Sequence, residues 1–254
     1  MDFNSSWNVK APLIIGHRGA SAYAPENTMS AFKMAYEMGA NAIEFDVKLT
    51  KDGEVVVLHD ATLDRTTNGS GRLSEWSLEE IKKLDAGGYL NGKYTVEHIP
   101  TLNEVLENLG SCLLFNIELT NYASITDDLA KKVIRKVEER GMENKVLLSS
   151  FNPLTLIRAN GITKRIPTAL LISRKQSALM RGLLQWITPY DVYHPHYSLV
   201  SRNLVVDQHR KGRKIITWTV NKPERIRTLL KMRIDGIITD KPDLGYEILD
   251  NRVN

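Results

Sequence analysis

Leu13-Ile14-Ile15-Gly16-His17 is a short apolar run that ends in a histidine, and similar runs recur along the chain. Nearly all-apolar runs of this length are typical of strands that are covered on both faces in a parallel sheet. We therefore expect nine strands, over Leu13–His17, Ala42–Val47, Val55–His59, Leu113–Leu119, Val146–Phe151, Thr168–Ile172, Val192–Tyr197, Lys214–Val220 and Gly236–Thr239.

Helical segments separate the runs, and several of them have recognisable ends. The pairs Ser77/Glu80 and Thr101/Glu104 fit the capping box, and Pro153 follows a residue suited to cap a helix. Strand–helix alternation over about 250 residues indicates either a closed (β/α)8 barrel or an open doubly wound sheet. No Gly-x-Gly-x-x-Gly follows a strand, which weighs against a dinucleotide-binding sheet.

Nine strands are one too many for an eight-stranded barrel. We expect Val55–His59 to lie outside the ring, because the tight turn Lys51-Asp52-Gly53 joins it directly to the preceding strand. Residues 61–100 contain turns and short helices but no clear strand, so they indicate a small insertion over one end of the barrel. Residues 1–254 are then one domain.

Composition limits the class of protein. The chain has 254 residues, of which 42% are hydrophobic and 25% charged, as in an ordinary globular protein. It has neither a run of about 20 apolar residues nor a secretory signal at its start. The single Cys112 lies in an apolar run, which predicts a buried, inert thiol in a reducing compartment. We expect a cytoplasmic protein.

Charge is unevenly distributed although the net charge is only +4. Residues 151–233 hold sixteen Lys and Arg against three acids, which indicates either an anionic partner or a set of solvated helix faces. Within this region, residues 176–187 are apolar and include Trp186 and Arg181. They could make a peripheral contact with an anionic membrane or form the outer wall of the barrel. No recognition motif supports nucleic-acid binding.

Acidic residues stand near the ends of two expected strands. Glu44 and Asp46 are two apart and therefore point to the same side of their strand, and Glu118 ends another. Three carboxylates without Cys or paired His ligands favour an oxygen-loving cation, Mg²⁺ or Ca²⁺. The alternative is that each acid caps a strand or pairs with Lys or Arg.

Two histidines, His17 and His59, occupy the same relative position at strand ends. Such a pair suits a reaction that needs one acid and one base near neutral pH. Arg18 has the planar fork that matches phosphate oxygens. Further candidates for the same pocket, with packing as the alternative, are His194, His196, Phe151 and Trp218.

These residues belong to a longer series of motifs. In chain order, the series resembles the signature of the glycerophosphodiester phosphodiesterase family over about residues 13–243. The matching segments are Gly16-His17-Arg18-Gly19-Ala20, Ala24-Pro25-Glu26-Asn27-Thr28, Glu44-x-Asp46, Leu49-Thr50-Lys51-Asp52-Gly53, Val57-Leu58-His59-Asp60, Thr62-Leu63-Asp64-Arg65-Thr66-Thr67, Ile99-Pro100-Thr101-Leu102, Asn116-Ile117-Glu118, Ser150-Phe151, Trp218-Thr219-Val220-Asn221 and Asp235-Gly236-Ile237-Ile238-Thr239-Asp240.

The resemblance implies a (β/α)8 TIM barrel and cleavage of a small glycerophosphodiester to glycerol 3-phosphate and an alcohol. It implies a divalent metal on Glu44, Asp46 and Glu118, with His17 and His59 as acid and base and Arg18 on the phosphate. Attack by water and attack by the glycerol 2-hydroxyl both remain open. Thr120 stands where the family commonly has lysine, so Tyr122, a basic residue of 151–233 or the metal alone would replace that charge.

Two alternative functions remain. A lysophospholipase D would use the same residues on lysophospholipids at a membrane surface. A noncatalytic barrel that binds a phosphate ligand would need no paired acid and base, so the retention of both histidines and all three acids argues against it.

Overall fold

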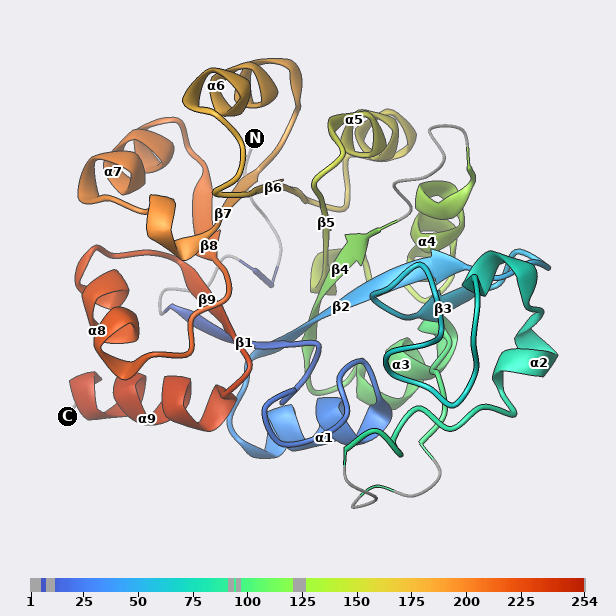
Figure 1. The fold of residues 1–254 in the computed structure, drawn as a ribbon. Helices are drawn as coiled ribbons and strands as arrows, with labels where there is room; N and C mark the ends of the chain where they lie inside the picture. The colour runs from blue at the N-terminus through green and yellow to red at the C-terminus, as the bar shows by residue number, and fades with distance from the viewer. Residues whose placement is uncertain (1–5, 8–11, 91–93, 95–96, 121–126, 254) are drawn as a thin grey trace.

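Eight parallel strands close into a barrel in this computed structural model, which describes residues 6–7, 12–90, 94, 97–120 and 127–253 (Figure 1). The strands follow the order β1-β9-β8-β7-β6-β5-β4-β2, and a pairing between β1 and β2 closes the ring. Their bounds are β1 Leu13–His17, β2 Ala42–Leu49, β4 Leu114–Leu119, β5 Val146–Ser150, β6 Thr168–Ile172, β7 Val192–Pro195, β8 Lys214–Thr217 and β9 Gly236–Thr239. The closed barrel is confirmed over the open sheet.

The ninth strand lies outside the ring, as predicted. β3, Val55–Val57, pairs antiparallel with the end of β2, with Val57 opposite Val47. Most observed strands are shorter than the sequence predicted. β7 and β8, for example, end at Pro195 and Thr217, where the chain leaves the ladder to form the loops that border the site.

Helices surround the barrel. Their bounds are α1 Met29–Glu37, α2 Leu78–Ile81, α3 Leu102–Leu109, α4 Leu129–Glu138, α5 Pro153–Ile162, α6 Ala178–Ile187, α7 Arg202–Arg210, α8 Pro223–Lys231 and α9 Pro242–Val253. Both predicted capping boxes are present, at the starts of α2 and α3, and Pro153 opens α5. α4 begins at Leu129, and residues 121–126 before it lie outside the described part of the chain.

A single apolar cluster fills the lower part of the barrel. It contains residues from every strand of the ring, so it can only lie inside it. Its members on the strands are Leu13, Ile15, Ala42, Leu147, Ala169, Val192, Ile216 and Ile238, with Leu114 packed against them. Two larger clusters pack the outer faces of the strands against the helices. Strand residues of the first cluster therefore point into the barrel, and those of the other two point toward the helices.

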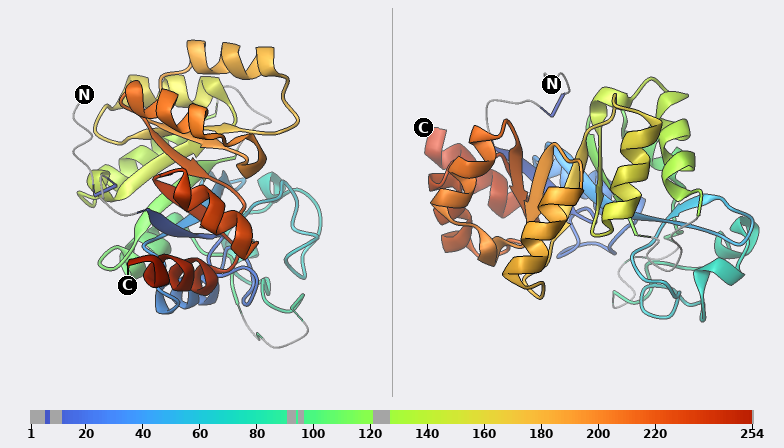
Figure 2. Two further views of the ribbon diagram at one scale, coloured as in Figure 1. Left: turned by 90° about the vertical axis from the view of Figure 1, so that its left-hand side faces the viewer. Right: turned by 90° about the horizontal axis from the view of Figure 1, so that it is seen from above.

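The segment between β3 and α3 has a small apolar core of its own. Leu63, Leu73 and Ile81 are completely or almost completely buried and pack with Val56 of β3. The segment carries a 3₁₀ turn at Leu73–Glu75 and the short helix α2, and it lies at one side of the barrel (Figures 1 and 2).

One sequence-based expectation was wrong. Cys112 is exposed rather than buried, because it lies in the turn between α3 and β4 and not in the strand itself. Its thiol donates to the carbonyl of Leu109. Among the described residues, no helix is long and apolar enough to cross a membrane.

Gly19 shows how tightly the first loop packs against α1. Its φ is +83°, and a Cβ there would lie 2.6 Å from the backbone of Ala31. Gly71 has nearly the same conformation, with φ +84°, but no atom lies within 4 Å of where its Cβ would be. The two glycines therefore separate the effect of backbone strain from that of steric overlap.

We predict that Gly71→Ala lowers the free energy of unfolding by about 1 kcal/mol, because only the left-handed backbone disfavours the methyl group. Gly19→Ala should lower it by about 2 to 4 kcal/mol, because overlap with α1 adds to the same strain. Urea unfolding followed by circular dichroism measures both. Equal losses for the two variants would contradict this packing.

Candidate functional site

The upper layer of the barrel interior is polar. Side chains two apart on a strand share a side, so His17 points inward above Ile15, and Glu44 and Asp46 point inward above Ala42. Glu118 stands directly beside Asp46 in the register of β2 and β4. The acids and the histidine therefore meet at the carboxyl ends of the strands, where barrels of this kind carry their active sites.

The three acids form one cluster, as the sequence predicted. Ligand oxygens of Glu44, Asp46 and Glu118 all lie within 4.8 Å of one another, and Glu44 and Asp46 are buried. Burial and the negative charges of Asp46 and Glu118 raise the pKa of Glu44 well above its ordinary value. Ionising Glu44 beside two other carboxylates is therefore unfavourable, and a positive charge in the cluster would offset this cost.

The geometry of the cluster fits a divalent cation. Ligand oxygens about 2.4 Å from Ca²⁺ or about 2.1 Å from Mg²⁺ lie at most about 4.8 or 4.2 Å apart. The three acids are therefore close enough to share one cation, Ca²⁺ or Mg²⁺, after a small contraction of the cluster. Asn116 is fully buried below Glu118, and within the described part of the chain neither atom of its amide has a hydrogen-bond partner. The side-chain oxygen of Asn116 is thus a further possible ligand for a cation in this cluster.

Arg18 and Asn27 hold Asp46 from the loop that follows β1. The Arg18 Nε lies 3.3 Å from Asp46 Oδ2, and the Asn27 side-chain amide donates to the same oxygen at 3.0 Å. Glu26 accepts a hydrogen bond from Nη1 of the same guanidinium at 2.8 Å. Both Arg18 and Asn27 have positive φ, so this loop keeps a strained backbone to place them. Burial works against the Arg18 charge, but the surrounding acids raise the pKa of Arg18.

His17 is oriented by an acid from the last barrel strand. Its Nδ1 lies 2.6 Å from Asp240 Oδ1. Ser21 also donates to Asp240, and the Asn221 amide donates to its other oxygen. Burial alone would raise the pKa of Asp240, but the hydrogen bonds from His17, Asn221 and Ser21 lower it. An ionised Asp240 fixes the proton of His17 on Nδ1 and leaves Nε2 free to exchange one.

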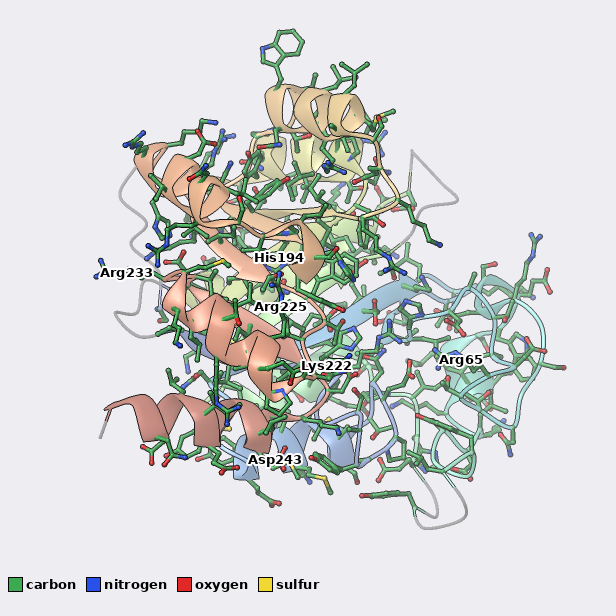
Figure 3. All side chains as sticks on the ribbon, turned by 60° about the vertical axis from the view of Figure 1, so that its left-hand side comes forward. Arg65, His194, Lys222, Arg225, Arg233 and Asp243 are labelled. Atoms are coloured by element: carbon green, nitrogen blue, oxygen red, sulfur yellow. The ribbon has the colours of Figure 1, made fainter. Side chains whose placement is uncertain are left out.

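His59 is oriented in the same way by its neighbour. Its Nδ1 lies 2.5 Å from Asp60 Oδ1, and Arg65 donates to Asp60 Oδ2 at 2.6 Å. The bonds from Arg65 are the main reason that the pKa of Asp60 falls to about 2. Arg65, labelled in Figure 3 on the segment after β3, also binds Glu26 through two further nitrogens. Arg65 thus joins the surroundings of His59 to those of Arg18.

One cavity of about 100 Å³ brings most of the predicted site residues together. Phe151 and Trp218 border it as an edge-to-face pair with ring centroids 5.4 Å apart, and the Trp218 indole donates to the His194 carbonyl. Asp46 is not among the residues that line this cavity. The lining residues are His17, Arg18, Glu44, His59, Asn116, Glu118, Phe151, Leu171, Trp218 and Ile238.

The other two candidate histidines do not line this cavity. His194, labelled in Figure 3, is fully buried inside the barrel, and neither ring nitrogen has a hydrogen-bond partner among the described residues. Burial lowers its pKa to about 3. It is therefore a neutral core residue. His196 instead packs edge-to-face against Trp218, with ring centroids 5.3 Å apart.

Sequence reasoning gave no role to several residues of the site. Asp60, Asn116 and Asp240 stood within the motifs, but the sequence does not show which histidine an acid will contact. Lys48 could have been found, because it continues the two-residue spacing of Glu44 and Asp46.

Lys48 brings a positive charge to Thr120, the position where the family commonly has a lysine. Its ammonium donates to the Thr120 hydroxyl at 2.7 Å and to the Thr120 carbonyl at 3.0 Å. Burial lowers the pKa of Lys48, while the charges of Asp46 and Glu118 act in the opposite direction. Tyr122, considered earlier for this place, lies outside the described residues. A cation therefore reaches Thr120 from the neighbouring strand, not from the basic region 151–233.

The chain is similar to known proteins over nearly its whole length. The model of the glycerophosphoryl diester phosphodiesterase family matches residues 17–244. A glycerophosphodiester phosphodiesterase of Caldanaerobacter subterraneus subsp. tengcongensis is 41% identical, over 91% of this chain and 95% of that protein. A Bacillus subtilis glycerophosphodiester phosphodiesterase is 33% identical, over 96% and 89%.

Solved structures agree with the sequence matches. A phosphodiesterase of Oleispira antarctica, solved in complex with the product sn-glycerol-3-phosphate, has a TM-score of 0.86 and 30% identity over 94% of this chain and 97% of that one. A Silicibacter pomeroyi structure described as a glycerophosphoryl diester phosphodiesterase has a TM-score of 0.84 and 27% identity, over 96% and 94%. The chain belongs to the glycerophosphoryl diester phosphodiesterase family.

Proposed function

We propose that this chain hydrolyses glycerophosphodiesters to glycerol 3-phosphate and an alcohol, with His17 and His59 as acid and base and a divalent cation on Glu44, Asp46 and Glu118. The observation that carries the proposal is the meeting of both imidazoles, Arg18 and the acids at one small cavity. The relative solved with glycerol 3-phosphate supports the choice of substrate.

Either Mg²⁺ or Ca²⁺ suits an all-oxygen ligand set of this kind. When bound, the cation would polarise the phosphoryl oxygens and offset the charge that builds up on them. Arg18 would add a guanidinium edge to the same phosphate, because Glu26 and Asp46 already fix its position beside the cavity.

The two imidazoles would move the protons. Each has Nδ1 on an aspartate, Asp240 for His17 and Asp60 for His59, so Nε2 is the nitrogen left to act on the substrate. One imidazole removes a proton from the attacking hydroxyl, and the other donates one to the departing alcohol oxygen. The attacking hydroxyl is that of water or the 2-hydroxyl of glycerol, and both routes need the same pair.

Phe151 and Trp218 would form the wall against the glycerol carbons. Their edge-to-face contact and the bond from the Trp218 indole to the His194 carbonyl fix both rings. Rigid apolar walls with a few polar groups are what a pocket for a small polyol phosphate needs. The alternative of a noncatalytic phosphate-binding barrel leaves the two oriented imidazoles without a purpose.

A membrane-bound substrate is the second candidate, and α6 favours it. Leu179 and Trp186 on this helix are 85% and 83% exposed, and Met180, Leu183 and Ile187 are also exposed. Arg174 and Lys175 precede the helix and are exposed too. An outward apolar face beside cations suits an anionic lipid surface, where the same site would meet lysophospholipids.

We predict that His17→Ala and His59→Ala each lower kcat for glycerophosphocholine by at least about 100-fold, because each removes one proton-transfer group. His98→Ala is the matched control, since His98 is exposed and bonds only to the Leu84 carbonyl among its recorded contacts; its kcat should stay within about twofold. Circular dichroism checks that each variant is folded.

The same variants assayed on a p-nitrophenyl diester of glycerol phosphate assign the two roles. A good leaving group needs little protonation, so the variant that lacks the acid should recover most of its loss. Near wild-type kcat in either variant on glycerophosphocholine would contradict the proposed pair.

For the second candidate, we predict that the protein floats with liposomes that contain phosphatidylserine at low salt. Leu179→Asp and Trp186→Asp should abolish flotation, because a charge on the apolar face opposes insertion. Val206→Asp on α7 is the control, since Val206 is 42% exposed but lies on another helix. No flotation of the wild-type protein at low salt would end this candidate.

A further inference from the structure

A second, larger hollow adjoins the site cavity. It has a volume of about 720 Å³ and lies between β2, Thr120 and the segment after β3. His59 lines both the cavity and this hollow, which we call the His59 groove. The other polar residues of the groove are Lys48, Asp60, Thr62, Arg72, Ser74 and Thr120.

The two volumes suit the two halves of a diester. The cavity, at about 100 Å³, has room for little more than the glycerol phosphate half. The alcohol on the other side of the phosphorus must extend elsewhere. The groove is open to it at His59, one of the two groups that would exchange a proton with the substrate.

Among the residues that line the groove, two are cations, Lys48 and Arg72, and one is a carboxylate, Asp60. Asp60 already binds both His59 and Arg65. Lys48 is only 9% exposed, and its ammonium bonds to the hydroxyl and carbonyl of Thr120, which are neutral. Arg72 also lines the groove and is exposed, and among the described residues its side chain forms no ion pair.

We propose that the His59 groove binds the alcohol half of the diester, and that Lys48 and Arg72 make it select an alcohol that carries a carboxylate or a phosphate. This inference rests on the proposed function. An ammonium and a guanidinium that line the same groove attract an anion and repel a quaternary ammonium such as choline.

Three glycerophosphodiesters test the proposal, with 3-hydroxypropionate, 3-hydroxypropionamide or choline as the alcohol. The first two have nearly the same shape and differ in charge. We expect kcat/KM to be at least about tenfold higher for the carboxylate than for the amide, and lowest for choline.

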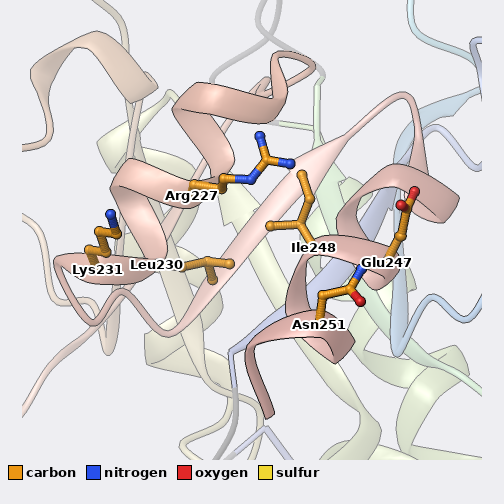
Figure 4. A pocket seen from close by; sticks show the side chains of 6 residues that line it. All are labelled: Arg227, Leu230, Lys231, Glu247, Ile248 and Asn251. Atoms are coloured by element: carbon orange, nitrogen blue, oxygen red, sulfur yellow. The ribbon is translucent and has the colours of Figure 1, made fainter. Parts of the chain in front are cut away.

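Variants locate the source of that preference. Arg72→Met should reduce the carboxylate-to-amide ratio by about tenfold while the amide rate changes little. Lys48→Met should reduce the same ratio by about tenfold. Thr120→Lys added to Lys48→Met should restore the ratio, because the Thr120 side chain contacts the place of the lost ammonium. Arg227→Met is the control: Arg227 lines a separate cavity between α8 and α9 (Figure 4).

The outcomes separate the two proposals. Hydrolysis of all three diesters without a preference for the carboxylate, or a preference that survives Arg72→Met and Lys48→Met, overturns the groove assignment and leaves the proposed function intact. Failure to hydrolyse any of them counts against the proposed function itself. If Lys48→Met does not fold, the ratio measured for Arg72→Met still tests the groove assignment, because Arg72 is exposed.

Discussion

Repulsion among three carboxylates is the constraint on which the rest of the site depends. Glu44, Asp46 and Glu118 share one small volume at the top of the barrel, and two of them are buried. Carboxylates this close to one another cannot all be ionised at low cost unless positive charge lies between them. Burial and the negative charges of Asp46 and Glu118 together raise the pKa of Glu44. The barrel imposes this arrangement, because the strand register puts Asp46 beside Glu118.

The surrounding charges follow from that constraint. Arg18 comes from the loop after β1 and forms an ion pair with Asp46, while Lys48 comes from β2 itself. Two further acids, Asp60 and Asp240, lie outside the cluster and each hold one imidazole. Arg65 binds both Asp60 and Glu26, so one guanidinium stabilises the surroundings of two elements of the site. Positive and negative groups thus alternate outward from the three acids.

Local pattern explains why much of this fold could be predicted. Apolar runs located all nine strands, and the capping boxes at Ser77 and Thr101 located two helix starts. The tight turn at Gly53 correctly placed β3 outside the ring. These features depend on residues only a few positions apart, so the sequence contains what determines them. The prediction that Cys112 is buried was wrong, because the apolar run that contains it begins before the strand does and Cys112 lies in the turn.

Contacts between distant strands explain what could not be predicted. The sequence suggested that Glu44, Asp46 and Glu118 gather, but not that Asp240 holds His17 across more than two hundred residues. The position of Lys48 beside Thr120 likewise depends on the register of β2 against β4. Barrel closure and register are properties of the whole ring, and no short stretch of sequence encodes them.

Direct titration of the metal-free protein with Mg²⁺, Ca²⁺ and Mn²⁺ by calorimetry tests the central claim most directly. The account predicts one cation per chain for the wild-type protein. It also predicts affinity at least about tenfold weaker in Asp46→Asn and Glu118→Gln, because each removes a charged ligand. Absence of binding to the wild-type protein, or equal binding by both variants, would contradict it.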